Sequence, residues 1–318
     1  MPYVEPLSDA RTKLEDFFNI LLIVRQTETN SVPIDRNRLT ADLHALVGER
    51  HPLTSPTHLQ QAEAYLHRQF LEAGLIVTAH EFEALSGTYR NVIAIAHPAS
   101  AHGSLPPLIL GAHFDTVEGS PGADDNASAL AVILHVARQV REMPLIRPIR
   151  LIAFNLEEEN LLGSAAYASF LSGTSEAIHG AIILECVGYA SHQEGSQKIP
   201  PGVPIAVPTI GDFLAVIGNE RSRALTGSVA QPMKSHLPMV PLIVPGNGEQ
   251  LPDTRRSDHT SFWEQGFPAV MLTDTANFRN PHYHRATDTL ETLNLDFIAS
   301  VAEGVTATVM ALAGEPTA

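Results

Sequence analysis

The sequence has only one cysteine, Cys186, among its 318 residues. An intramolecular disulfide is therefore impossible, which fits a protein of a reducing compartment. Basic residues are scarce too: 20 lysines and arginines stand against 35 aspartates and glutamates, for a formal net charge of −15 at pH 7. So little positive charge argues against a nucleic-acid partner, because the phosphates would meet no basic surface.

Long apolar runs, repeats and low-complexity tracts are also missing. The apolar stretch 17–24 is far too short to span a bilayer, and the first residues lack the basic and apolar regions of a signal peptide. We therefore expect a cytoplasmic protein with no membrane partner. With 44% hydrophobic and 17% charged residues, the composition is typical of a globular protein.

Strand and helix signals alternate along most of the chain. Residues 1–52 read as a helical preamble of two helices around a break at Pro33, packed on a main domain of residues 53–318. In that domain the patterns predict helices at 56–73, 127–141, 162–171, 211–226 and 293–313, and strands at 75–85, 91–96, 108–112, 148–156, 181–185 and 267–272. Ser55 and either Asp125 or Asn126 are candidate helix caps. This order favours one α/β domain, with a mixed but mostly parallel sheet between two layers of helices.

Two segments rich in proline and glycine, 191–208 and 232–252, interrupt this order. Long irregular segments in a compact domain are usually functional. We interpret both as loops that shape a substrate pocket, with Met233, Leu237 and Met239 as candidates for its apolar wall.

Polar residues gather where the predicted strands end. His113 and Asp115 are two residues apart, so both side chains point the same way at the carboxyl edge of the sheet, where open α/β sheets hold their ligands. A histidine in such a place is, by itself, more often structural than a metal ligand. Further polar side chains follow the later strands: Asp124, Asp125, Glu157, Glu158, Glu159, Glu185, Asp258, His259, His282 and His284. Carboxylates crowded at one edge repel one another, and divalent cations remove that cost.

Five blocks in this order resemble the di-zinc aminopeptidases, a family that includes bacterial leucyl aminopeptidases and whose relatives include glutamate carboxypeptidase and glutaminyl cyclase. The blocks are His113-Phe114-Asp115, Gly122 to Ser128, Glu157-Glu158 before Leu161-Leu162-Gly163-Ser164, Glu185, and Tyr283-His284 before Asp288-Thr289. The resemblance covers residues 55–315 and implies a zinc-exopeptidase fold.

The resemblance also implies a role for each residue. Asp125 would bridge two zinc ions, with His113 and Glu185 on one ion and Glu158 and His284 on the other; Co²⁺ or Mn²⁺ are alternatives. Asp115 would orient His113. The metals would lower the pKa of a shared water and polarise the scissile carbonyl, while Glu157 would act as the general base. Tyr283 would stabilise the oxyanion or simply pack beside His284.

Several neighbours of these residues need a separate interpretation. Counting back from Gly163-Ser164 to the family pattern assigns roles to Glu157 and Glu158 and leaves Glu159 as a solvated residue. As the metal ligand, His284 is preferred to His282 because it follows Tyr283. Asp124 would support its turn, and Asp258 would be structural or support a ligand. Cys186 follows Glu185 on a strand, so we expect it to face the opposite side of the sheet as a core residue.

The function implied is hydrolysis of N-terminal residues from peptides or small aminoacyl substrates. A glutaminyl-cyclase-like enzyme stays open, as does a carboxypeptidase or dipeptidase in which Arg255 or Arg256 binds a substrate carboxylate. A binding module without catalysis ranks lower, because no ligand and no general base is missing.

Overall fold

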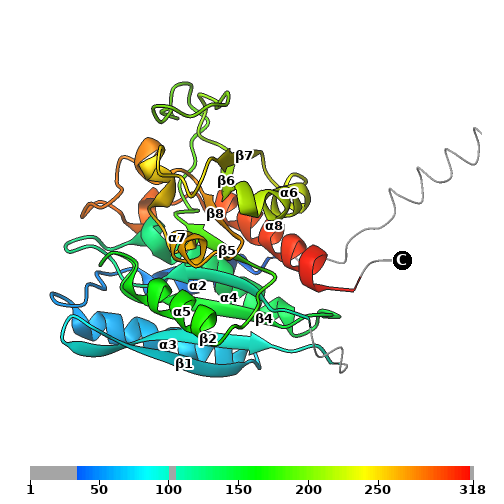
Figure 1. Cartoon of the computed structure of the whole chain (residues 1–318). Helices are drawn as coiled ribbons and strands as arrows, with labels where there is room; N and C mark the ends of the chain where they lie inside the picture. Colours follow the sequence, from blue (N-terminus) through cyan, green and yellow to red (C-terminus); the bar gives the residue numbers. More distant parts are fainter. Residues whose placement is uncertain (1–33, 100–104, 316–318) are drawn as a thin grey trace, which may run out of the picture. The chain divides into compact units, whose positions relative to one another are not determined.

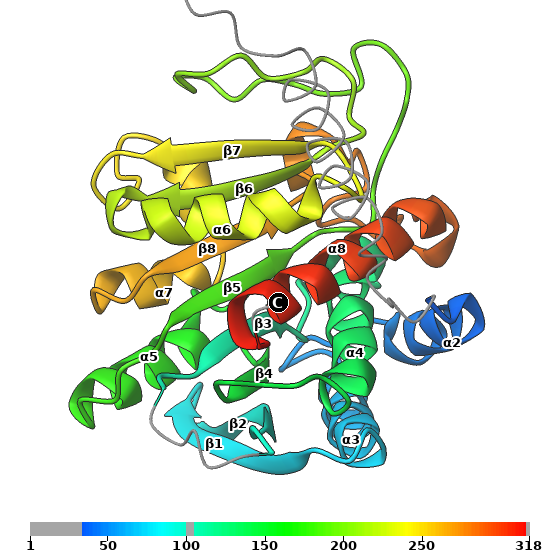
Figure 2. The same ribbon diagram turned by 90° about the vertical axis from the view of Figure 1, so that its right-hand side faces the viewer.

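The computed structural model describes residues 34–99 and 105–315, which build an α/β fold around one eight-stranded sheet. The strand order is β1-β2-β4-β3-β5-β8-β6-β7 (Figure 2). The strands are β1 (Ile76–Ala84), β2 (Gly87–Ala96), β3 (Leu108–His113), β4 (Ile149–Phe154), β5 (Gly180–Glu185), β6 (Leu214–Asn219), β7 (Met239–Val244) and β8 (Ala269–Thr273). The central strands β4, β3, β5 and β8 run parallel, and β1, β2 and β6 each join by antiparallel pairing. The predicted mixed sheet is confirmed.

Helices cover both faces of this sheet (Figure 1). They are α2 (Arg36–Leu46), α3 (Pro56–Glu72), α4 (Ala129–Val140), α5 (Leu162–Gly173), α6 (Arg223–Met233), α7 (His259–Glu264) and α8 (Leu295–Ala313). Side chains of β3 alternate between two buried clusters: Leu108 and Leu110 pack in the cluster with α4 and α8, and Ile109 in the cluster with α5 and α7. A strand buried on both faces reads as a continuous apolar run, which is why β3 was easy to predict.

Helix α8 is long and apolar enough, by length and composition, to cross a membrane. Half of that apolar stretch is buried inside this fold, where α8 packs against α4 and α6. Gly304 of α8 lets α6 approach closely: a Cβ added there would lie 3.2 Å from Cε of Met233. Met233 and Leu237 therefore belong to the core, and the expectation that they line a substrate pocket is wrong.

The region from 211 to 252 differs most from its prediction. The helix expected at 211–226 is instead strand β6 followed by α6, and the segment 232–252, expected as a loop, contains strand β7. Pro241 lies within β7, which is compatible with a strand because β7 is at the edge of the sheet, where a missing N–H costs no ladder bond. The short helix α7 was not predicted.

The predicted helix caps also need correction. Ser55 precedes α3, but its side chain makes no capping hydrogen bond. Helix α4 begins only at Ala129, because residues Ala123–Ser128 form a π-helical turn, η1, in which Asp125 and Asn126 have non-helical backbone angles. Of the two helices expected in residues 1–52, the first lies outside the described residues, and the second is α2.

Candidate metal centre

The predicted ligands meet at the carboxyl edge of the parallel strands. His113 is the last residue of β3 and Glu185 the last of β5, while Glu157 and Glu158 lie in the turn that follows β4. Asp125 comes from η1, just before α4. The sheet thus brings together side chains that lie as far apart in the sequence as His113 and Glu185.

Asp125 lies between the two predicted histidine ligands. Its Oδ1 is 3.1 Å from Nε2 of His113, and its Oδ2 is 3.1 Å from Nε2 of His284. Each histidine also faces a second carboxylate: His113 Nε2 is 3.5 Å from Oε2 of Glu185, and His284 Nε2 is 3.3 Å from Oε2 of Glu158. The side chains therefore form two sets of three that share Asp125.

Several ligand atoms in these sets lack a hydrogen-bond partner. His113 Nε2, His284 Nε2, Asp125 Oδ1 and Glu158 Oε1 are all inaccessible to solvent, yet none makes a hydrogen bond of acceptable geometry. Burying such groups without a partner is costly. Imidazole nitrogens and carboxylate oxygens at these separations suit zinc, cobalt or manganese, so the residues fit divalent cations.

The charges of the cluster show the same need for a cation. Burial, together with Glu185 and Glu158, raises the pKa of the Glu157 carboxyl well above its usual value, and burial beside Asp125 raises the pKa of Glu158 to about 7. Burial alone would lower the pKa of His284, but Asp125 and Glu158 raise it to about 10. Without a metal, the cluster holds protons that a cation would replace.

The three adjacent glutamates take different directions. Glu158 faces His284, whereas Oε2 of Glu157 lies 4.0 Å from Nε2 of His113. Glu159 turns away from the cluster, and its Oε1 lies 3.3 Å from Nε2 of His51. His282 likewise turns away, toward Oγ1 of Thr287 at 2.9 Å.

Asp115 supports the cluster in two ways. Nδ1 of His113 is 3.2 Å from the backbone oxygen of Asp115 and 3.5 Å from its Oδ1. The carboxylate itself accepts hydrogen bonds from the backbone N–H groups of Glu157 and Glu158, both at 3.0 Å. Asp115 therefore links His113 to the turn that carries the glutamates.

Around Glu185 the structure adds residues that the sequence did not indicate. Ser257 Oγ donates to Glu185 Oε2 at 2.8 Å. Cys186 is buried but does not face the opposite side of the sheet: β5 ends at Glu185, Cys186 has a φ of +50°, and its Sγ donates to Glu185 Oε1 at 3.4 Å. The alternation of a strand does not extend past its last residue. Asp258 directly precedes α7, and burial raises its pKa to about 7.

Arg50 holds the loop between the first two ligands in the sequence. This arginine is 1% exposed, and its guanidinium donates to five backbone carbonyls: those of Leu46, Gly48, Phe114, Pro121 and Gly122. Burial lowers its pKa to about 10, which leaves it charged at neutral pH. Three carbonyls between His113 and Asp125, those of Phe114, Pro121 and Gly122, thus converge on one buried cation.

Tyr283 and Arg256 stand together beside the cluster. The ring of Tyr283 stacks on that of His284 with centroids 3.9 Å apart, and Arg256 Nη2 donates to Tyr283 Oη at 3.2 Å. Arg255 points elsewhere, donating to the carbonyl of Asn247 and to Glu264. The two neighbouring arginines are therefore not equivalent.

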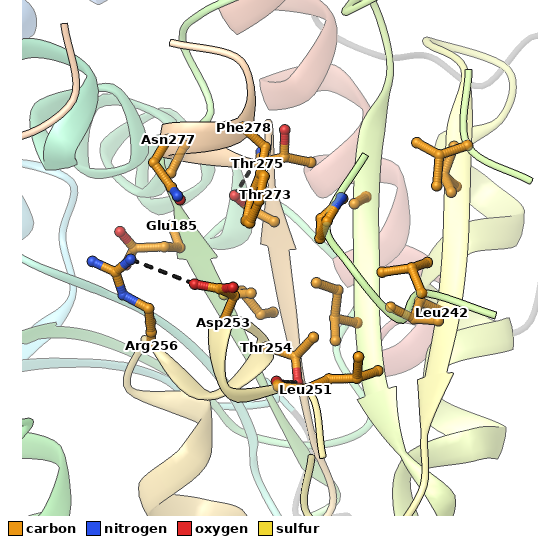
Figure 3. Close-up of a pocket in the computed structure, with 18 of the residues that line it drawn as sticks. Glu185, Leu242, Leu251, Asp253, Thr254, Arg256, Thr273, Thr275, Asn277 and Phe278 are labelled. Atoms are coloured by element: carbon orange, nitrogen blue, oxygen red, sulfur yellow. Dashed lines mark hydrogen bonds and ion pairs between the residues drawn. The ribbon is translucent and has the colours of Figure 1, made fainter. Parts of the chain in front are cut away.

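An apolar pocket opens next to Glu185, Arg256 and Tyr283 (Figure 3). Counted with its mouth, it encloses about 930 Å³. Its apolar wall comes from the sheet face of β6–β8 and from the segment 191–208: Ala215, Ile217, Val240, Leu242, Met271, Val203, Ile205 and Val207. Both proline-rich segments contribute to the lining, but Met233, Leu237 and Met239 do not.

Comparisons with known proteins place the chain in a family by its sequence. Residues 91–309 match the sequence profile described as Peptidase family M28. The uncharacterized protein YfbL of Escherichia coli is 30% identical over 308 residues, a match that covers 90% of this chain and 92% of YfbL.

Two solved structures share the fold. BSAP, a zinc aminopeptidase from Bacillus subtilis, has a TM-score of 0.55 at 25% identity and is similar over 73% of this chain and 52% of its own. The glutaminyl cyclase of Porphyromonas gingivalis has a TM-score of 0.61 at 18% identity, over 87% of this chain and 95% of its own. Fold by itself does not separate these two reactions. The profile match extends over more than half of the chain, and YfbL matches nearly all of it; the chain belongs to peptidase family M28.

Proposed function

We propose that this protein is a zinc-dependent aminopeptidase with two ions per chain. The observation that carries the proposal is the pair of three-residue sets that share Asp125, with their unpartnered buried ligand atoms. His113, Asp125 and Glu185 would hold one ion, and Asp125, Glu158 and His284 the other. The likeness to a zinc aminopeptidase supports zinc as the metal.

Zinc, when bound, would supply a Lewis acid that polarises the scissile carbonyl and makes water more acidic. The proton of that water would pass to Glu157, which lies beside His113 and belongs to neither ligand set. Glu157 would then deliver the proton to the leaving amine. Burial, with Glu185 and Glu158 nearby, raises the pKa of this carboxyl, which makes Glu157 a better proton acceptor.

The pocket would receive the side chain of the N-terminal residue. Most of its wall is apolar, and Glu185 and Arg256 lie beside each other at one end (Figure 3). Tyr283, stacked on His284, would donate its hydroxyl proton to the developing oxyanion; because Arg256 donates to Tyr283 Oη, that proton is free to point elsewhere.

The test uses the full chain loaded with zinc and a panel of aminoacyl p-nitroanilides. We expect zinc-dependent release of nitroaniline, fastest with large apolar residues. Absence of turnover on the whole panel, in protein shown to contain zinc, would contradict the proposal. Pyroglutamate formation from N-terminal glutamine, with one ion per chain, would favour a cyclase instead.

Arg256 favours a second candidate, a dipeptidase. Its guanidinium is half-exposed at the pocket mouth, and Asp253 Oδ1 lies 3.7 Å from its Nη1. An arginine so placed has donors left for a substrate carboxylate. If it binds one, Arg256→Met will raise KM for a dipeptide about tenfold or more, as expected when a charge-assisted hydrogen bond is lost, and will leave KM for the matching dipeptide amide unchanged. Equal effects on both substrates would exclude carboxylate recognition.

A further inference from the structure

Asp288 lies four residues after His284 in a loop segment that has no predicted role in the centre. Its side chain is fully buried, at 0% exposure. Oδ1 accepts a hydrogen bond from the backbone N–H of Asp124 at 3.0 Å, and Oδ2 accepts one from the N–H of Asp125 at 3.1 Å. The backbone oxygen of Asp288 accepts a third, from the N–H of Ala123 at 3.2 Å.

The same arrangement occurs at Asp115 on the other side of the cluster. There, the two carboxylate oxygens accept the consecutive N–H groups of Glu157 and Glu158, and the residue itself follows His113 by two positions. In each case an aspartate that follows a histidine ligand in the sequence accepts two hydrogen bonds from the backbone of a segment that carries a carboxylate ligand. Asp115 connects His113 to the turn of Glu157 and Glu158, and Asp288 connects the loop that follows His284 to the backbone of Asp125.

Besides Asp288, the neighbouring Asn126 ties this segment to β5: its Nδ2 donates to the carbonyl of Leu184 at 3.0 Å, and its Oδ1 accepts the N–H of Cys186 at 3.1 Å. Asp125 and Asn126 have non-helical angles within η1, so the intrahelical bonds that fix an ordinary helix are interrupted there. Yet the two oxygens of Asp125 must meet two different histidines, each at 3.1 Å. A small rotation of this segment would lose one contact or both.

We propose that Asp288 is a positioning residue of the metal centre, whose carboxylate fixes the backbone of Asp124 and Asp125 and so aims Asp125 at both ions. The inference rests on the proposed ligand sets. Residues that hold metal ligands in place contribute about 10- to 100-fold to metal affinity. Asp288 would therefore govern affinity without touching an ion.

The experiment compares Asp288→Asn with a matched control, Asp42→Asn. Asparagine keeps one acceptor oxygen, but its amide N–H₂ would face a backbone N–H group, so one of the two hydrogen bonds is lost. Asp42 is equally buried and accepts hydrogen bonds from Arg138 and Tyr65 rather than from a ligand segment. Both variants remove one buried carboxylate charge.

Three measurements are made on each full-length protein: the melting temperature in chelator, the visible absorption during Co²⁺ titration, and Zn²⁺ competition with a chromogenic chelator. We expect two ions per chain in the wild type. In Asp288→Asn we expect at least one ion to bind about 10- to 100-fold more weakly, with altered Co²⁺ bands. Asp42→Asn should melt at a lower temperature and keep both metal constants.

Two ions bound to Asp288→Asn with wild-type constants would overturn the inference. If Asp288→Asn does not fold in chelator, Asp288→Glu is measured, which keeps the charge but shifts it by one methylene; wild-type metal constants there would also overturn it. Failure of both variants to fold, while Asp42→Asn folds, would assign Asp288 to stability alone. Absence of metal binding by the wild type is a separate result, because it removes the proposed centre itself.

Discussion

Residues 157–159 show how much depends on a single position. Three consecutive glutamates are chemically identical in the sequence, and only their distance from Gly163 and Ser164 separated their expected roles. In the structure Glu158 faces His284, Glu157 lies near His113 and Glu185, and Glu159 pairs with His51. The roles in catalysis and metal binding remain predictions that substitutions can test.

Glu157→Ala is expected to retain zinc and to lose activity about 10²-fold or more, the usual contribution of a general base. The control is Glu159→Ala, which removes the same side chain two residues away and should keep both zinc and rate. The measurements are kcat on an aminoacyl p-nitroanilide and metal content per chain. Loss of zinc from Glu157→Ala would mean that Glu157 is a ligand.

Some residues of the centre carry no signal in the sequence. Ser257 hydrogen-bonds to Glu185 across 72 residues, and no local pattern marks a serine for that contact. The prediction for Cys186 was wrong because side chains alternate between faces only within a strand, and β5 ends one residue before Cys186. By contrast, the five ligands implied by the family blocks lie close together, because those blocks encode chemistry rather than packing.

Among the elements, strands buried on both faces were the easiest to predict. β3 and β5 are short, continuous apolar runs, and the prediction placed their ends within a residue or two. β6 was predicted as part of a helix at 211–226. β7 was predicted as a loop, because Pro241 within it indicates a loop unless the strand is known to lie at an edge. Edge position is a property of the sheet and is not visible in a single segment.

Strand β6 supplies the prediction for the pocket. Ala215 lies in its wall and is small, so Ala215→Phe would place a ring inside the cavity. We expect kcat/KM for phenylalanyl p-nitroanilide to fall about tenfold or more, which corresponds to a loss of about 1–3 kcal/mol of apolar contact. The alanyl substrate serves as internal control and should change little. An equal loss on both substrates would indicate damage to the fold rather than a filled pocket.

For the whole molecule, the main electrostatic feature is a buried acidic cluster in a chain that is already strongly negative. In the metal-free protein the pKa of Glu158 is raised to about 7 by burial and then by Asp125. A carboxyl group whose pKa is higher in the folded than in the unfolded protein stabilises the fold. Its contribution is fully present below the unfolded pKa of about 4.5 and is lost as the pH rises through 7. The pKa of His284 is raised to about 10, so this residue changes stability with pH in the same direction. Its stabilising contribution is fully present below about pH 6.5 and is lost toward pH 10.

The free energy of unfolding of the metal-free protein should therefore fall from about pH 5 to pH 9. Zinc should stabilise the protein most at the upper end of this range, because it competes with protons for the same ligands. Denaturant unfolding in chelator and in zinc at several pH values measures both effects, and Glu158→Gln should flatten the metal-free curve. A metal-free protein that becomes more stable with rising pH would contradict this account.

The hydrogen bonds from Arg50 to five backbone carbonyls also limit where a fragment of this chain that keeps the metal centre can begin. The family profile matches only from residue 91, and the ligands begin at His113. A fragment cut at either place would leave the carbonyls of Phe114, Pro121 and Gly122 without their cation, beside the segment that carries Asp125. Part of the segment that was expected to be a preamble thus holds the backbone beside the candidate metal centre, and we expect a fragment without Arg50 to lose that support.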